Sequence, residues 1–419
     1  MSLADRTAEL LFLKTLQGLQ RGSLEIIYNG KRLQFGPKTD DLHAIVEVHN
    51  PSFFRKALLS GDTGIGESFM DGDWTSPNVV NVIRLAVRNI NHLESSNSWF
   101  SALSRTANRI QHLLRINSIT GSKKNIAAHY DLSNEFFKLF LDESMMYSCA
   151  WFDSASDTLE QAQWNKLDRI CRKLQLQPGD KILEIGTGWG SFALHAAKHY
   201  GAHVTTTTIS REQHALASER FHAYDPQGAQ IHLLMEDYRK LTGKFDKIVS
   251  IEMFEAVGLD FYDEFFSTCD RLLNPNGAMC MQTITLLDQK FPAYHRSSDW
   301  IQKYIFPGGE LASVSRILQS LERSTKLTLY TAEDMGTHYA RTLAEWRNRF
   351  QQQIPAVAEL GFDSRFIRMW KFYLDYCEGA FLERHVSTFQ LMMIKTYAQQ
   401  DFAGEPWSGS RQRAMRATP

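Results

Sequence analysis

The chain has 419 residues, a length that predicts two or three domains. Its 46 Lys and Arg residues nearly balance its 47 Asp and Glu residues, which argues against binding of nucleic acid through bulk positive charge. No run of 18 apolar residues predicts a transmembrane helix, the first residues lack the basic-then-apolar order of a signal peptide, and the scattered cysteines favour reduced thiols in the cytoplasm.

Residues 1–92 are predicted to form a small α+β domain. In chain order we expect a helix at 3–21, a hairpin at 24–36 around Asn29-Gly30, a strand at 42–50, a short helix at 51–59, glycine-rich loops at 61–78 and a helix at 79–95. A plain structural core is the simplest role for its apolar residues. Docking of a lipid, or of a second subunit in a homodimer, is the alternative.

A linker is predicted at residues 93–120, because this stretch is rich in Ser, Asn and Arg. Its basic residues, with Arg105, Arg109 and Arg115 among them, suit either a solvated helix face or a surface that touches anionic lipid. A catalytic domain is expected over 121–400, followed by a tail at 401–419.

The catalytic domain centres on residues 181–190, KILEIGTGWG, which predict a buried strand, a tight glycine turn and a following helix. The spacing is GxGxG, and the next strand ends near Thr208 without the carboxylate that a dinucleotide site requires. Glu184 precedes the turn, and Glu236-Asp237 ends the third strand, where an acidic group can accept from an adenine amine. These features favour an S-adenosylmethionine (SAM) methyltransferase.

Strands alternate with helices from residue 158 to residue 286, which predicts a doubly wound, mostly parallel, Rossmann-like sheet. Beyond residue 287 the alternation breaks, and helices at 340–398 are expected to form a cap. Glu252, Glu255 and Gln282 follow strands and therefore belong at the carboxyl edge of the sheet, where ligands bind.

Several stretches in the right order resemble the cyclopropane-fatty-acyl-phospholipid synthase family. They include AAHYDLSNEFFKLFLDESMMYSCAWF, LEIGTGWG, FDKIVSIEMFEAVG, DWIQKYIFPGG, HYARTLAEWRNRF and CEGAFLER, within about residues 121–390. YSCA, MFEAVG and KYIFPGG have no general methyltransferase role, so the resemblance is specific. It implies transfer of a methylene unit from SAM to the cis double bond of an acyl chain in a membrane phospholipid, which forms a cyclopropane.

The resemblance also implies a bound bicarbonate that removes a proton from the carbocation. It would be held by the backbone of Cys149, by Glu255, by the backbone of Ile284 and by Tyr339. Gln282 stands where many members of the family carry His. Because Gln can donate a hydrogen bond but cannot exchange a proton near neutral pH, the anion site is expected to persist with an altered pH response.

For SAM, the implied contacts come from the residues before the turn, the turn itself and the ends of the next strands. They are Tyr130, Tyr147, Ser148, Gly186, Gly188, Gly190, Thr208, Gln213, Asp237 and Tyr238.

Four points stay open at the level of sequence. Glu252 competes with Glu255 for the functional role. Cys149 is expected to contribute its backbone rather than a nucleophilic thiolate. His195 and His199 are spaced i, i+4 but lack a third ligand, so no metal site is expected. The phenylalanines at 136, 137 and 140 suit a core and a lipid tunnel equally well.

The sequence also leaves open the chemical product and whether the protein is an enzyme at all. A relative that leaves a methyl or methylene branch differs only in which proton is removed. A non-catalytic lipid-binding or lipid-transfer protein is the alternative from another class. As an enzyme, the protein would work from the cytoplasm at the inner face of the membrane, in transient contact with phospholipid and with no nucleic-acid partner.

Overall fold

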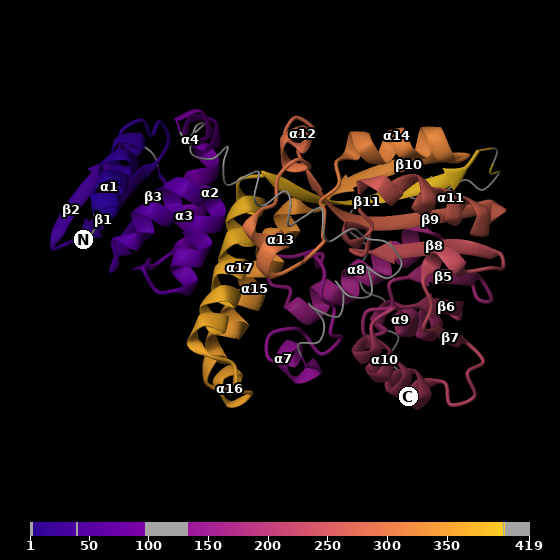
Figure 1. Cartoon of the computed structure of the whole chain (residues 1–419). Helices are drawn as coiled ribbons and strands as arrows, with labels where there is room; N and C mark the ends of the chain where they lie inside the picture. Colours follow the sequence, from indigo (N-terminus) through magenta and orange to yellow (C-terminus); the bar gives the residue numbers. More distant parts are fainter. Residues whose placement is uncertain (1–2, 39–40, 97–132, 397, 399–419) are drawn as a thin grey trace.

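The computed structural model describes residues 3–38, 41–96, 133–396 and 398. These residues form a four-stranded sheet near the N-terminus and a seven-stranded sheet in the rest of the chain. The two sheets lie at opposite ends of the molecule, with the long helices α15 (Gly336–Gln352) and α17 (Ser364–Leu382) between them (Figure 1). The predicted linker, the predicted tail and Tyr130 lie outside the described residues, apart from the last turn of α4.

The small sheet has the order β2-β1-β3-β4, with β1 parallel to β3 and antiparallel to β2. The predicted hairpin is confirmed: Asn29 and Gly30 both have positive φ, 50° and 73°, as a tight two-residue turn requires. The elements in chain order are α1 (Leu3–Leu16), β1 (Ser23–Tyr28), β2 (Lys31–Phe35), β3 (His43–Val48), α2 (Ser52–Met70), β4 (Trp74–Thr75), α3 (Val79–Arg88) and α4 (Ile90–Ser96).

The prediction of loops at 61–78 is wrong for residues 61–70, because α2 continues to Met70, and it holds for 71–78 apart from the short strand β4. Gly61 bends the helix with φ 55° and ψ −130°, and helical geometry then resumes. The glycines that suggested a loop have a tertiary cause instead. A Cβ on Gly66 would stand 2.4 Å from the Trp300 indole, so glycine permits α2 to pack against the catalytic domain.

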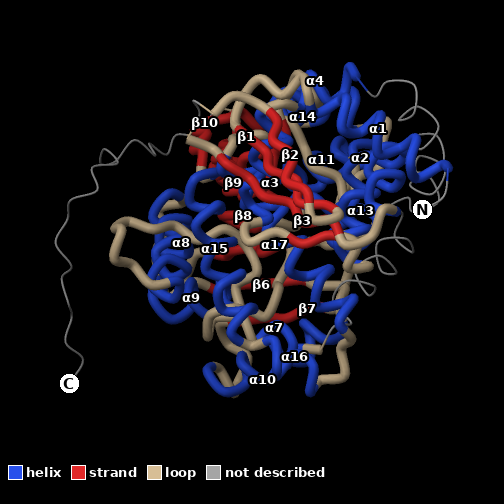
Figure 2. The backbone as a smooth tube through the Cα atoms, turned by 90° about the vertical axis from the view of Figure 1, so that its left-hand side faces the viewer, coloured by secondary structure: helices blue, strands red, loops and turns tan. Residues whose placement is uncertain are grey.

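The large sheet has the order β10-β11-β9-β8-β5-β6-β7, and β11 is antiparallel to both of its neighbours. The other adjacent strands run parallel, which confirms a doubly wound Rossmann-like sheet. Figure 2 views this sheet past the N-terminal domain, with β10 at the top and β7 at the bottom. Its strands are β5 (Lys181–Ile185), β6 (His203–Thr207), β7 (Ile231–Leu234), β8 (Phe245–Ile251), β9 (Leu273–Leu286), β10 (Leu327–Asp334) and β11 (Val386–Lys395).

Both faces of the large sheet are buried, because successive strand residues point to opposite sides. Leu183 and Ile185 of β5 pack with α11 (Tyr262–Leu272) and α14 (Val314–Ser324). Ile182 packs on the other face with α8 (Leu159–Lys173), α9 (Ser191–Tyr200) and α10 (Arg211–Tyr224). This explains the nearly continuous apolar runs in the sequence of these strands.

The cap is built from α7 (Asn134–Lys138), α12 (Phe291–Tyr294), α13 (Trp300–Tyr304), α15, α16 (Ile354–Glu359) and α17. Phe136, Phe137 and Phe140 are completely buried, and each makes ring contacts with Trp370 of α17. They form the core of the cap, so the structure favours the first of their two proposed roles. Among the described residues, no helix is both long and apolar enough to cross a bilayer.

Candidate active site

The glycine turn between β5 and α9 opens onto a large cavity of about 780 Å³. Gly188 has a φ of 53°, lines the cavity, and has no atom within 4 Å of the place where a Cβ would stand, so a ligand can approach its backbone closely. Gly190 serves packing instead. A Cβ there would meet the Phe221 ring at 2.5 Å, and Gly190 does not line the cavity.

Most of the predicted SAM contacts meet at this end of the cavity. Thr208 donates to the Gln213 side-chain oxygen at 2.9 Å, which fixes both at the end of β6. The Asp237 carboxylate accepts from the backbone and guanidinium of Arg239, with a shortest distance of 2.7 Å. The predicted contacts that line the cavity are Tyr147, Ser148, Gly186, Gly188, Thr208, Gln213, Asp237 and Tyr238. An open glycine turn flanked by polar side chains fits a nucleoside with a sulfonium side chain.

Glu252 is the centre of a hydrogen-bond cluster just after β8. Its Oε1 accepts from the Cys149 backbone N–H at 2.9 Å and from the Gln282 amide at 2.8 Å. Its Oε2 accepts from the Tyr339 hydroxyl at 2.8 Å. Glu252 has a φ of 48°, a left-handed conformation that non-glycine residues seldom adopt. This uncommon backbone conformation directs the Glu252 side chain towards its three donors, a type of local strain that is frequent at functional sites.

The orientation of the Gln282 amide is set by a chain of buried partners. Lys173 can only donate, and it donates to the Gln390 side-chain oxygen. The Gln390 amide nitrogen therefore donates to the Gln282 oxygen, at 2.9 Å. Gln282 is left with its nitrogen facing Glu252. Gln282, Gln390 and Lys173 together make a one-directional chain that ends on the Glu252 carboxylate.

Glu255 lies beside this cluster with a different role. Its Oε1 accepts from the Ile284 backbone N–H and from the Thr283 hydroxyl, while its buried Oε2 has no hydrogen-bond partner among the described residues. Burial, and next the nearby Glu252 charge, raises the pKa of Glu255 to about 8. Glu255 is therefore mostly protonated at pH 7, and it presents an uncharged carboxyl group to the cavity.

These contacts bear directly on the bicarbonate that the resemblance implied. The four predicted donors are the backbone N–H groups of Cys149 and Ile284, the Gln282 amide and the Tyr339 hydroxyl. Each already donates to a carboxylate of the chain, either Glu252 or Glu255. The predicted residues do come together, but Cys149, Gln282 and Tyr339 enclose the Glu252 carboxylate. Ile284 is bonded to Glu255, so no donor of the set is left for an added bicarbonate.

Lys166 of α8 is a component of the site that the sequence analysis missed. It is completely buried, and its ammonium donates to the Ser148 hydroxyl at 2.7 Å. Burial lowers the pKa of Lys166 to about 8, and the Glu252 charge is the main opposing influence. A signal did exist, because Lys166 lies on the buried stripe of α8 with Leu159, Ala162 and Ile170.

The thiol of Cys149 is not placed for nucleophilic chemistry. It is fully buried, does not line the cavity, and burial raises its pKa well above the usual range. His195 and His199 stack with Trp164 at edge-on angles, and no cluster of potential metal ligands occurs in the part of the chain that the structure describes.

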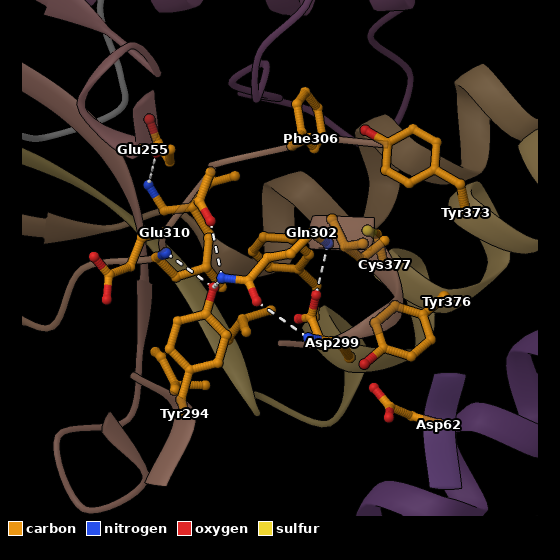
Figure 3. A pocket seen from close by; sticks show the side chains of 18 of the residues that line it. Asp62, Glu255, Tyr294, Asp299, Gln302, Phe306, Glu310, Tyr373, Tyr376 and Cys377 are labelled. Atoms are coloured by element: carbon orange, nitrogen blue, oxygen red, sulfur yellow. Dashed lines mark hydrogen bonds between the residues drawn. The ribbon is translucent and has the colours of Figure 1, made fainter. Parts of the chain in front are cut away.

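One wall of the cavity is the loop that contains Phe306 and Glu310 (Figure 3). The Gln302 amide holds this loop by donating to the Gly309 carbonyl at 2.9 Å and to the Tyr294 hydroxyl at 3.2 Å. Tyr294 in turn accepts from the Leu311 backbone N–H. The KYIFPGG motif is therefore part of the cavity wall rather than a surface turn.

The doubly wound sheet and the glycine turn at its edge define a SAM-dependent methyltransferase. Residues 117–391 match the family described as mycolic acid cyclopropane synthetase, about two thirds of the chain. The chain therefore belongs to the cyclopropane synthase family of these enzymes, as the sequence motifs predicted.

Two curated relatives match most of the chain. The tuberculostearic acid methyltransferase UfaA1 of Mycobacterium tuberculosis is 37% identical over 83% of this chain and 82% of its own length. The cyclopropane-fatty-acyl-phospholipid synthase of Escherichia coli is 38% identical over 84% of this chain and 88% of its own length.

Solved structures in the family match the catalytic part. The cyclopropane synthase MmaA2 from Mycobacterium tuberculosis has a TM-score of 0.61 and 31% identity, and covers 65% of this chain and 98% of its own. The mycolic acid cyclopropane synthase CmaA1 complexed with SAH and CTAB has a TM-score of 0.60, with the same identity and coverage.

Proposed function

We propose that this enzyme transfers a one-carbon unit from SAM to the cis double bond of an unsaturated acyl chain in a membrane phospholipid, and that the product is a cyclopropane. The observation that carries the proposal is the Glu252 carboxylate, held by three donors in the cavity that begins at the glycine turn. The two relatives named above, a tuberculostearic acid methyltransferase and a cyclopropane-fatty-acyl-phospholipid synthase, suggest the class of substrate.

The chemistry needs a base more than it needs a nucleophile. SAM supplies an electrophilic methyl group when bound. An acyl chain that has accepted this methyl group carries a positive charge until one proton leaves. Glu252 accepts the proton from the transferred methyl group, and the electron pair of that C–H bond closes the three-membered ring. The apolar parts of the cavity wall, including Ile284 and Phe306, keep out water that would otherwise capture the cation.

Glu252 takes the part that the resemblance gave to bicarbonate. Burial raises the pKa of Glu252, and its three donors, together with the Lys166 charge, offset part of this rise by stabilising the carboxylate form. The proton then has a path away from the cation, because the Tyr339 hydroxyl bonded to Glu252 Oε2 also lines the cavity. Glu255, which stays neutral, shapes the pocket without placing a second anion beside the first.

A methylene-branched acyl chain is the second candidate product, and the similarity to a tuberculostearic acid methyltransferase favours it. For this product a hydride first shifts from the methylated carbon to the neighbouring cationic carbon. Loss of a proton from the new methyl group then leaves the double bond on the branch. A methyl branch would need a further reduction by a separate reductant. Whether the hydride shift precedes proton transfer to Glu252 decides between branch and ring.

The site of action follows from the substrate. The phospholipid lies in a bilayer, so the enzyme works at the inner membrane face from the cytoplasm, with transient surface contact. The predicted homodimer through the N-terminal domain remains part of the proposal.

The test uses purified protein, SAM with an isotopically labelled methyl group, and vesicles of a dioleoyl phospholipid. We expect the recovered acyl chains to gain one labelled carbon and two hydrogens, and to resist ozonolysis as a cyclopropane does. Labelled chains that ozonolysis still cleaves would establish the branched product. Saturated vesicles serve as the control, and absence of label from the unsaturated lipid would reject the proposal.

A further inference from the structure

The cavity does not end at the active site, because it extends into the N-terminal domain. Its walls there are apolar residues from six elements of that domain, and these residues are themselves buried: Leu16, Leu24, Val46, Phe53, Trp74 and Ile83. The hollow therefore lies inside the hydrophobic core of the small domain. Glu252 and the glycine turn line the same cavity.

A hollow core is costly for a domain of this size. Protein interiors are normally packed as tightly as organic crystals, and small domains bury little surface to compensate for a void. Voids lined by apolar side chains stay dry and bind apolar molecules. The hollow thus indicates a ligand that fills it with hydrocarbon.

The passage between the two parts of the cavity disfavours an anionic ligand. Asp62 of α2 faces Tyr376 and Asp299 of the catalytic domain across this passage (Figure 3). Asp299 is engaged as the cap of α13, where it accepts from the Gln302 backbone N–H at 2.7 Å. Among the described residues these two acidic side chains have no basic partner at the passage, which disfavours a phosphate group but leaves room for a neutral chain.

We propose that the N-terminal domain is a binding site for a saturated hydrocarbon chain of the lipid substrate, and this inference rests on the proposed function. The chain enters from the active site, passes Asp62 and ends between α1, α2, α3 and the small sheet. Two parts of one phospholipid have the required chemistry: the methyl end of the reacting chain, and the second, saturated acyl chain.

Photo-crosslinking of the full-length enzyme tests the proposal and separates the two sources. Two versions of a palmitoyl-oleoyl phospholipid carry a diazirine at the methyl end, one on the oleoyl and one on the palmitoyl chain. After irradiation in vesicles, peptide mass spectrometry locates the adducts. We expect adducts within residues 12–93 from one of the two probes, and that probe identifies the source. Adducts confined to residues beyond 133 with both probes would overturn the proposal.

A variant that narrows the hollow in the N-terminal domain gives a second test of the proposal. Ala57 lines the hollow and is 3% exposed, whereas Leu59 on the same helix is 42% exposed and lies outside it. We expect Ala57→Phe to lower turnover of dioleoyl vesicles at least tenfold with unchanged SAM affinity, and Leu59→Phe to stay within twofold of wild type. Folded Ala57→Phe protein with full turnover would contradict the proposal. Wild-type turnover of lipid without any N-terminal adduct would reject this inference alone and leave the proposed function intact.

Discussion

We expect the Glu252→Gly variant to lose turnover of unsaturated phospholipid and to regain it when bicarbonate or formate is added. Glycine adopts the φ of 48° at this position without strain, so the variant keeps the fold. The side chain that leaves is the base of the proposed reaction, and a positioned base contributes about 10²- to 10⁴-fold to a rate. That loss corresponds to roughly 2.7–5.4 kcal/mol of activation free energy.

The structure also gives the reason for rescue. Removal of the carboxylate leaves the Cys149 N–H, the Gln282 amide and the Tyr339 hydroxyl directed at an empty, carboxylate-sized space. A buried donor without a partner costs about 1–3 kcal/mol, so three such donors should recruit a small oxyanion from solution. The variant would then use the external anion that the wild type does not need.

The assay is incorporation of labelled methyl groups into dioleoyl vesicles in buffer freed of carbon dioxide, with and without added anion. Chloride at equal ionic strength is the control for salt effects, and a thermal melt checks that the variant is folded. Two results would refute the reasoning. One is a wild-type enzyme that stops when carbon dioxide is removed, and the other is a Glu252→Gly variant that works at the wild-type rate without any added anion.

Three further outcomes follow from the same site. Because burial raises the pKa of Glu255 from 4.5 to about 8, its protonated form stabilises the fold below pH 4.5, and this stabilisation is lost as pH rises through 8. Denaturant titrations should therefore show a steeper fall in the free energy of unfolding between pH 4.5 and 8 for wild type than for Glu255→Gln. Removing the nearby cation in Lys166→Met should raise the pKa of Glu252, and the acid limb of the kcat–pH profile should move to higher pH; an unmoved limb would show that the two groups are not coupled. Gln390→Leu should free the Gln282 amide to rotate and lower kcat about tenfold with an unchanged KM for SAM, whereas an equal change in both would indicate a merely structural role.

The sequence predicted the features that depend on neighbouring residues or on long sequence motifs. The strand, turn and helix around Gly186 and Gly188 follow from neighbouring residues alone, and the alternation of strands and helices fixed the parallel sheet. The choice between Glu252 and Glu255 needed more, because both follow β8 by a few residues. The left-handed backbone at Glu252 decides which carboxylate meets the three donors, and no propensity indicates that a glutamate will adopt it.

The errors share one physical cause, which is tertiary contact overriding local preference. Gly66 looks like a loop residue in sequence but is a point of close helix packing against Trp300. Lys166 was missed although it lies on the apolar stripe of α8, because the buried acids and the Ser148 hydroxyl that retain its charge inside the protein come from distant parts of the chain. The hollow in the N-terminal domain has no local signature at all, because its apolar walls are the same residues that a filled core would contain.

The close helix packing at Gly66 and Gly379 limits how a lipid can enter the cavity. Gly66 lies against Trp300, and Gly379 of α17 lies so near Ile83 of α3 that a Cβ would stand 2.8 Å from that side chain. Because the N-terminal and catalytic domains pack this closely at two places, they cannot separate without loss of both contacts. A phospholipid tail must consequently be threaded in end first from the bilayer. Release of the bulkier, ring-bearing product along the same route would then limit the rate of the catalytic cycle.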